Sequence, residues 1–243
     1  MNAEAIPHDS VTDQLTGHDW SALAGELNGY GYAVLKELLP PDICRAIASL
    51  YTEERHFRSR VHMVRHGFGI GEYRYFRYPF PAFLEDMRSV LYAYLAPIAN
   101  EWNERMGIER RYPEDHGEFL KKCHTAGQKR PTPLLLKYGA GDYNCLHQDV
   151  YGDLVFPLQA AILLSQPGVD YEGGEFVLTE QRPRMQSRVE VVSLRQGDAV
   201  VFAVQNRPVH GTRGDYRINM RHGVSRVRSG QRYMLGLIFH DAT

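Results

Sequence analysis

The hydrophobic pattern of the chain changes near residue 132, and this change constrains the fold more than any other feature of the sequence. Beyond that point, short runs rich in Val, Leu, Ile, Phe and Tyr recur, separated by turns that contain Gly or Pro. The runs are PLLLKYG, DYNCLHQD, FPLQAAILLS, GEFVLT, VEVVSL, DAVVFAV and QRYMLGLIF. Apolar runs of this length between turn formers predict β-strands. Their number and spacing predict an antiparallel sandwich or barrel.

Before residue 132 the pattern is mainly helical. One helical face is formed by three apolar residues, Trp20, Leu23 and Leu27. The run YAVLKELLPP after them predicts a strand that the two prolines end, and a helix follows. A longer apolar face over residues 83–102 predicts a long helix that is kinked near Pro97 and ends at Gly107.

No internal repeat, low-complexity tract or flexible linker divides the 243 residues, so we expect a single domain. Residues 1–132 are expected to form a helical support and lid. Residues 133–243 are expected to form a β-core, which makes the fold class mainly β with α.

Composition excludes several classes of protein. The chain has 28 basic and 29 acidic residues, so it is not a strongly basic protein that coats nucleic acid through bulk charge. No apolar run is long enough to span a membrane, and the opening MNAEAIPHDSVTDQ does not resemble a secretory signal. Three cysteines at scattered positions suggest neither a disulfide framework nor a zinc site. We therefore expect a cytoplasmic protein without a membrane partner.

The tripeptide His147-Gln148-Asp149 lies in a predicted strand. Side chains alternate between the two faces of a strand, so His147 and Asp149 should project from the same side. An imidazole and a carboxylate over one cavity can be two ligands of a metal. A third ligand would leave coordination positions open, as in Fe(II) oxygenases.

Two histidines are candidates for the third ligand. His210 lies in RPVHGTRG, which reads as a surface loop, whereas His222 lies in MRHGVSRV at the predicted start of a strand. Arg232 follows His222 by ten residues, and a turn at RSG would form a hairpin that returns Arg232 to the same cavity. A guanidinium inside a barrel is costly unless it meets an anion, so Arg232 indicates an anion-binding site in this cavity. The hairpin would place His222 beside that site, which favours His222 as the third ligand. The alternative is His210 paired with Arg221.

In order, HQD, EGGEFVL, LRQGDAVVF and HGVSRVRSGQRYMLGLIF resemble the 2-oxoglutarate- and Fe(II)-dependent dioxygenases, nearest the prolyl-4-hydroxylase-like branch. The resemblance covers about residues 133–240. It is most similar to a bacterial group of these oxygenases that is described as nucleic-acid-demethylating. The resemblance implies a double-stranded β-helix, also called a jelly roll or cupin-like fold.

The resemblance also implies cofactors and site residues. Iron would be bound by His147, Asp149 and His222, which would be the catalytic metal ligands. Arg232 and Tyr138 would bind the distal carboxylate of 2-oxoglutarate. Dioxygen would be the second cosubstrate, and ascorbate is the expected reductant. The presence of a carboxylate at Asp149 favours hydroxylation or demethylation over halogenation.

The substrate is left open by the sequence. The stretch RHFRSRVHMVRHGFGIGEYRYFRYPF interleaves arginine with aromatic residues, as a nucleic-acid-binding surface does. The same pattern fits arginine stems packed on aromatic rings at the edge of the helical layer. An alkylated base, a protein side chain and a small metabolite are all candidate substrates. A carboxylate-binding β-barrel sensor and a cupin-like enzyme with another metal are the alternatives to a dioxygenase.

Overall fold

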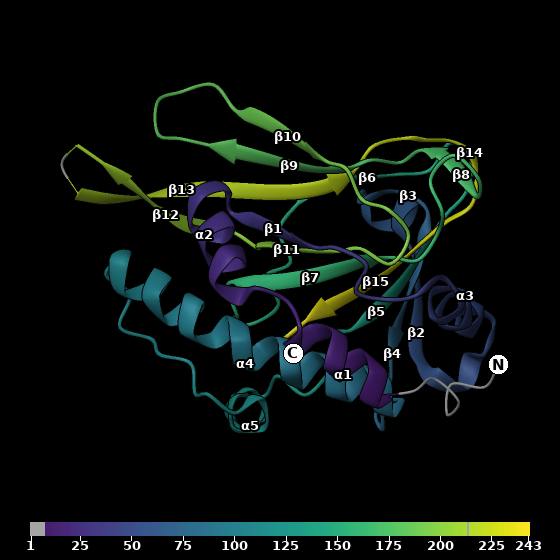
Figure 1. Cartoon of the computed structure of the whole chain (residues 1–243), viewed down its shortest axis with the longest axis horizontal. Helices are drawn as coiled ribbons and strands as arrows, with labels where there is room; N and C mark the ends of the chain where they lie inside the picture. The colour runs from purple at the N-terminus through teal and green to yellow at the C-terminus, as the bar shows by residue number, and fades with distance from the viewer. Residues whose placement is uncertain (1–7, 213) are drawn as a thin grey trace.

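The computed structural model describes residues 8–212 and 214–243. It contains two large antiparallel sheets that face each other (Figure 1). The seven-stranded sheet has the strand order β1 (Tyr32–Leu35), β11 (Ala199–Ala203), β7 (Leu158–Leu163), β15 (Arg232–Ile238), β5 (Leu134–Tyr138), β4 (Glu72–Phe76) and β2 (Phe57–His62).

In the six-stranded sheet, five strands form one continuous order and the sixth pairs with a strand of that order. The order is β10 (Arg188–Val192), β9 (Phe176–Gln181), β13 (Gly214–Val224), β6 (Tyr143–His147) and β3 (Gly69–Ile70), and β12 (Asn206–Gly211) pairs with β13. A small third sheet joins β14 (Val227–Gly230) to β8 (Tyr171–Gly173).

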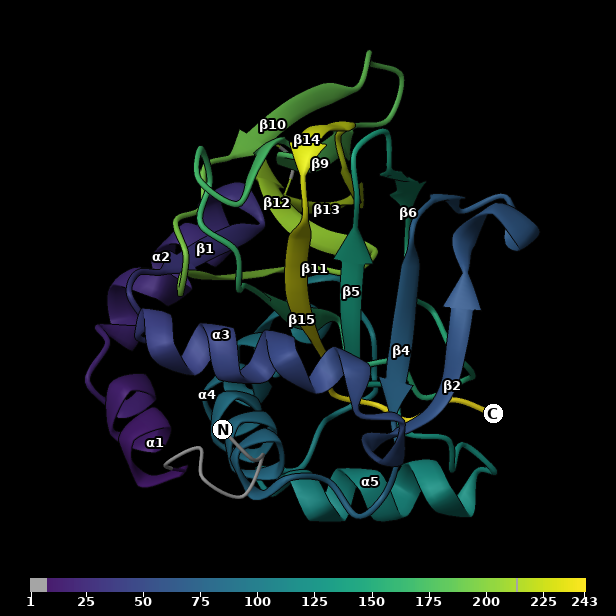
Figure 2. The same ribbon diagram turned by 90° about the vertical axis from the view of Figure 1, so that its right-hand side faces the viewer.

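Most of the helices gather on the side of the seven-stranded sheet that faces away from the six-stranded sheet, and one lies at the edge beside β1, where it also contacts β12 (Figures 1 and 2). They are α1 (His8–Thr16), α2 (Trp20–Tyr30), α3 (Pro41–Ser49), α4 (Ala82–Arg105) and α5 (His116–Thr125). All residues of β7 and β11 are buried, because helices cover one face of these strands and the second sheet covers the other. A strand covered on both faces has a continuous apolar sequence rather than an alternating one. This three-layer arrangement leaves the space between the sheets for a site.

The predicted fold class is confirmed, and so are the helices around Leu23 and over residues 83–102. Helix α4 continues through Pro97 and ends at Arg105, before Gly107 adopts a positive φ of 65°. No helix in the described part of the chain is both long and apolar enough to cross a bilayer.

Two expectations about the β-strands need correction. Strands β1 to β4 come from the first half of the chain and complete both sheets, so a location of the β-core in the C-terminal half alone is not confirmed. The predicted hairpin between His222 and Arg232 is wrong, because β13 and β15 belong to different sheets. The intervening strand β14 pairs with β8 instead. The chain therefore crosses from one sheet to the other between these two residues.

Candidate metal centre

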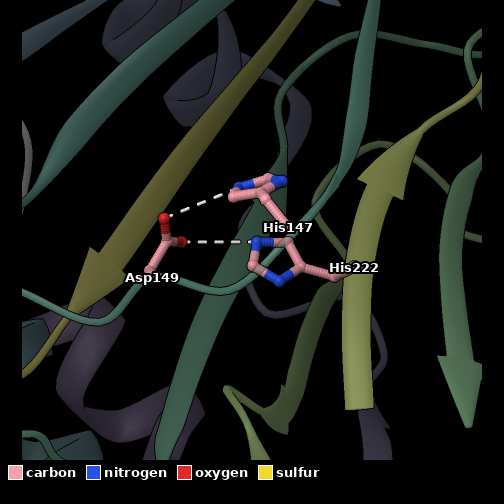
Figure 3. A group of neighbouring side chains, drawn as sticks. All are labelled: His147, Asp149 and His222. Atoms are coloured by element: carbon pink, nitrogen blue, oxygen red, sulfur yellow. Dashed lines mark ion pairs between the residues drawn. The ribbon is translucent and has the colours of Figure 1, made fainter. Parts of the chain in front are cut away.

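His147, Asp149 and His222 meet in the space between the two sheets (Figure 3). His147 is the last residue of β6, Asp149 lies two residues beyond it, and His222 lies near the end of β13. Each offers one ligand atom, and these atoms all lie within 4.8 Å of one another. The three residues that the sequence singled out as a metal site are therefore adjacent in space.

The carboxylate of Asp149 faces both imidazoles from one side (Figure 3). Its Oδ1 is 3.5 Å from Nε2 of His147, and its Oδ2 is 3.3 Å from Nε2 of His222. A β-bulge shapes this arrangement, because the register between β13 and β6 shifts between His222 and Val224. Bulges re-aim side chains beside functional sites, and this one lies next to two of the three residues.

The protonation states suit a metal. Burial alone would raise the pKa of Asp149, but the hydrogen bond to His222 and the charges of both histidines outweigh burial and hold that pKa well below its ordinary value. Burial lowers the pKa of His222, which favours the neutral imidazole. Nδ1 of His147 lies 2.7 Å from the carbonyl oxygen of Cys145, to which it donates when Nε2 is the ligand atom.

Further polar residues surround the carboxylate. The hydroxyl of Tyr151 donates to Oδ1 of Asp149 at 2.7 Å. The amide nitrogen of Gln159, on β7, donates to Oδ2 at 2.9 Å. The hydroxyl of Tyr75, on β4, lies 3.4 Å from that of Tyr151. Residues of the seven-stranded sheet and of the segment after β6 thus fix the orientation of Asp149.

The three residues open into a cavity of about 230 Å³. Most of its lining is apolar or aromatic, and it comes from both sheets: Phe68, Leu136, Tyr138, Phe176, Val224 and Met234. Water is largely excluded from such a surface, which strengthens electrostatic interactions inside it. A cavity of this kind is the usual form of a small-molecule site.

Arg232 lies beside this cavity and contacts two of the residues that line it. It pairs in register with Tyr138 across β15 and β5, and its guanidinium carbon is 5.6 Å from the centre of that tyrosine ring. Its Nη2 contacts the sulfur of Met234 at 3.3 Å. Arg232 is 1% exposed, yet its Nε and Nη1 have no hydrogen-bond partner among the described residues. A buried cation in this state is costly unless an anion joins it.

The alternative pair of His210 and Arg221 lies outside the site. The side chain of His210 is 81% exposed, and its Nδ1 is 3.0 Å from Oδ1 of Asp215. Arg221 is exposed on β13, opposite Thr179 of β9. His210 also lies in a strand rather than in the expected loop. The structure brings His222, and not His210, to the other two residues.

Sequence reasoning did not identify Tyr151 or Gln159 as parts of the site, and it included Phe68 only within the arginine- and aromatic-rich stretch 55–80. Gln159 had a usable signal, because it is the only polar residue of the apolar strand β7. Tyr151 had no such signal, because it lies outside the strands and belongs to no apolar or polar pattern.

Comparisons with known proteins give the following matches. A family model described as "Oxygenase, catalysing oxidative methylation of damaged DNA" matches residues 71–242. An uncharacterized protein found in two strains of Mycobacterium tuberculosis is 51% identical over 164 residues, which are 68% of this chain and 70% of that protein.

Solved structures with similar folds have low sequence identity. A prolyl hydroxylase from Trichoplax adhaerens, in complex with a hypoxia inducible factor peptide fragment, has a TM-score of 0.56 at 12% identity and covers 97% of this chain and 94% of its own. A 2OG-Fe(II) oxygenase family oxidoreductase from Burkholderia pseudomallei has a TM-score of 0.54 at 15% identity and covers 93% and 94%. A Pseudomonas putida prolyl-4-hydroxylase has a TM-score of 0.52 at 16% identity and covers 89% and 96%. These structures share the fold of this chain.

Proposed function

The chain belongs to the family of oxygenases whose model spans residues 71–242, and from this premise we propose that it is an Fe(II)- and 2-oxoglutarate-dependent dioxygenase acting on alkylated bases of nucleic acid. One observation carries the proposal. His147, Asp149 and His222 converge in an apolar cavity beside the buried Arg232, two of whose nitrogens have no hydrogen-bond partner among residues 8–212 and 214–243.

The residues fit the iron. Two imidazoles and one carboxylate form the ligand set that non-haem Fe(II) oxygenases use, and it leaves positions for a chelating cosubstrate and dioxygen. The low pKa of Asp149 and the lowered pKa of His222 keep both groups in their metal-binding forms near neutral pH. The chain therefore needs little change of protonation to bind the ion.

The residues also fit 2-oxoglutarate. The unpartnered nitrogens of Arg232 can form a charge-assisted pair with the distal carboxylate of the ketoacid. Tyr138 lines the cavity, and its ring lies over the same guanidinium. Met234 contacts Arg232 on the cavity side, and a flexible thioether can move aside when a carboxylate enters. Arg232 and Tyr138 would thus set the depth at which the cosubstrate binds.

When bound, the iron and 2-oxoglutarate supply the oxidising chemistry, in which dioxygen is reduced, the ketoacid becomes succinate and carbon dioxide, and a substrate C–H bond is hydroxylated. The chain orients the reactants and keeps water out. Tyr151 and Gln159 hold the carboxylate of Asp149, and the apolar lining excludes bulk solvent.

The substrate proposal rests on the rim of the cavity and on the family. Phe68 lines the cavity but is 46% exposed, and its ring stacks on His66 with centroids 5.3 Å apart. An open aromatic face beside an active cavity can stack on an extruded base. Phe68 belongs to the arginine- and aromatic-rich stretch 55–80. Arginines of this stretch pack on rings, as Arg58 does over Tyr75 at 4.3 Å. Only the part of the segment near the rim therefore supports the nucleic-acid interpretation.

Succinate release tests the proposal. Apoprotein loaded with Fe(II), 2-oxoglutarate and ascorbate should release succinate and formaldehyde with a single-stranded oligonucleotide that carries an N-methylated base. The unmethylated oligonucleotide should give only background. Turnover with a proline-containing peptide, and none with the methylated oligonucleotide, would replace a base by a protein side chain as the substrate. No consumption of 2-oxoglutarate under any condition would favour a sensor.

A further inference from the structure

Strand β7 is apolar along its length except at Gln159. This side chain is 5% exposed and lies between the two sheets, where it lines the cavity. A buried carboxamide costs free energy unless its donor and its acceptor both find partners. The partners of Gln159 therefore indicate why a polar residue is present in this strand.

The amide nitrogen of Gln159 contacts two members of the metal centre. Nε2 donates to Oδ2 of Asp149 at 2.9 Å and lies 3.3 Å from Nε2 of His222. The hydroxyl of Tyr151 donates to the other carboxylate oxygen, Oδ1. Two donors on opposite oxygens hold the carboxylate in one orientation and so reduce the entropy that is lost when a metal binds.

The amide oxygen of Gln159, unlike its amide nitrogen, lacks a hydrogen-bond partner among the described residues. This atom, Oε1, is buried. A buried acceptor without a donor is unfavourable, so a bound molecule that supplies the donor would gain free energy. Since Gln159 lines the cavity next to the ligand atoms, that molecule would lie beside the metal.

We propose that Gln159 is a positioning residue of the metal centre. Its amide nitrogen orients Asp149 for coordination, and its amide oxygen accepts a hydrogen bond from a water or an N–H group bound next to the metal. The proposal rests on the proposed function only in requiring that His147, Asp149 and His222 bind a divalent ion.

Anaerobic titration of the apoprotein with Co(II), followed by calorimetry and visible absorption, tests this role without turnover. Gln159→Met keeps the length of the side chain but removes both polar groups. We expect about 10- to 100-fold weaker Co(II) binding and a changed absorption spectrum. The matched control is Gln196→Met, because Gln196 donates to the backbone oxygen of Leu164 and does not line the cavity. The control should bind Co(II) as the unsubstituted protein does.

The outcomes separate the two proposals. If Gln159→Met binds Co(II) with unchanged affinity and spectrum, Gln159 is not a positioning residue. If the unsubstituted protein does not bind Co(II), the metal centre and the proposed function are both wrong. Should Gln159→Met fail to fold by circular dichroism, Gln159→Asn serves instead. Its amide is one methylene too short to reach Asp149, so it should show the same loss, and unchanged binding would overturn the role.

Discussion

His147 and His222 lie directly opposite each other on the antiparallel strands β6 and β13, with ring centroids 4.1 Å apart. The two residues are 75 positions apart in the chain, since 222 minus 147 is 75. Strand pairing alone therefore brings together the two imidazoles of the metal centre, and Asp149 joins them from the turn that follows β6.

Removal of a ligand should abolish metal binding. We expect Asp149→Ala and His222→Ala each to lose Fe(II)-dependent succinate formation and stoichiometric Co(II) binding, because two ligands cannot hold the ion in this cavity. His210→Ala is the control, since His210 pairs with Asp215 at the surface. Calorimetry and a succinate assay measure both effects. Loss of binding in His210→Ala, with retention in His222→Ala, would reverse the choice of ligand.

Arg232 should bind the cosubstrate at a cost to the stability of the apoprotein. A charged hydrogen bond contributes about 1.5 to 3 kcal/mol, so Arg232→Met should raise the KM for 2-oxoglutarate by about 10- to 150-fold. Two of its nitrogens are buried and have no hydrogen-bond partner within the described structure, so the same variant should be at least as stable in urea as the unsubstituted apoprotein. Arg221→Met is the exposed control. An unchanged KM in Arg232→Met would remove Arg232 from the cosubstrate site.

Phe68 should contribute to nucleic-acid binding and not to metal binding. Stacking on a base is worth about 1 to 3 kcal/mol, so Phe68→Ala should weaken binding of a methylated single-stranded oligonucleotide by about 5- to 150-fold. Val64→Ala is the control in the same segment, because Val64 is 66% exposed and does not line the cavity. Fluorescence anisotropy across a salt series measures both variants. Equal affinities, or binding that salt does not weaken, would argue against nucleic acid as the substrate.

Mild acid should destabilise the apoprotein through buried histidines. Burial lowers the pKa of His116 to about 3 and that of His240 to about 4, from an ordinary value of 6.5. The unfolded chain then binds protons below pH 6.5 that the folded chain does not, so this stability is complete above pH 6.5 and is lost as the pH falls towards 4. At pH 5 the loss is about 2 kcal/mol for each histidine.

Urea unfolding at pH 7 and pH 5 measures this loss. In His116→Gln the difference between the two pH values should shrink by about 2 kcal/mol, because one of the two histidines no longer titrates. An identical difference in the variant and in the unsubstituted protein would show that His116 is not responsible for the loss.

Much of the fold could be predicted because its signals are local. The apolar face of Trp20, Leu23 and Leu27 lies on α2, and the apolar runs beyond residue 132 coincide with strands. Strands β2 to β4 were missed, since β3 has only two residues and arginines lie among the aromatic residues of β2 and β4. Strands β4 and β2 extend the sheet beyond β5, whereas β3 pairs with β6 of the six-stranded sheet.

The site was only partly predictable, because sequence patterns report local geometry and not contacts between distant segments. His147 and Asp149 are two residues apart, so their proximity follows from local geometry. The hairpin proposed to return Arg232 to His222 does not exist, and the two residues approach the cavity region from opposite sheets. The contact of Gln159 with Asp149 joins β7 to a turn after β6 and has no sequence signature beyond a polar residue in an apolar strand.

The sequence by itself determined which segments become strands, where the chain turns and which residue types are available to bind a metal, because these depend on side-chain chemistry over a few neighbouring positions. Only the tertiary structure decided that His222 and not His210 completes the group, that two buried nitrogens of Arg232 have no hydrogen-bond partner in the described part of the chain, and that Gln159 touches the ligands. The physical reason is that any apolar strand can pair with many others, and the partner is selected by the packing of the whole sandwich.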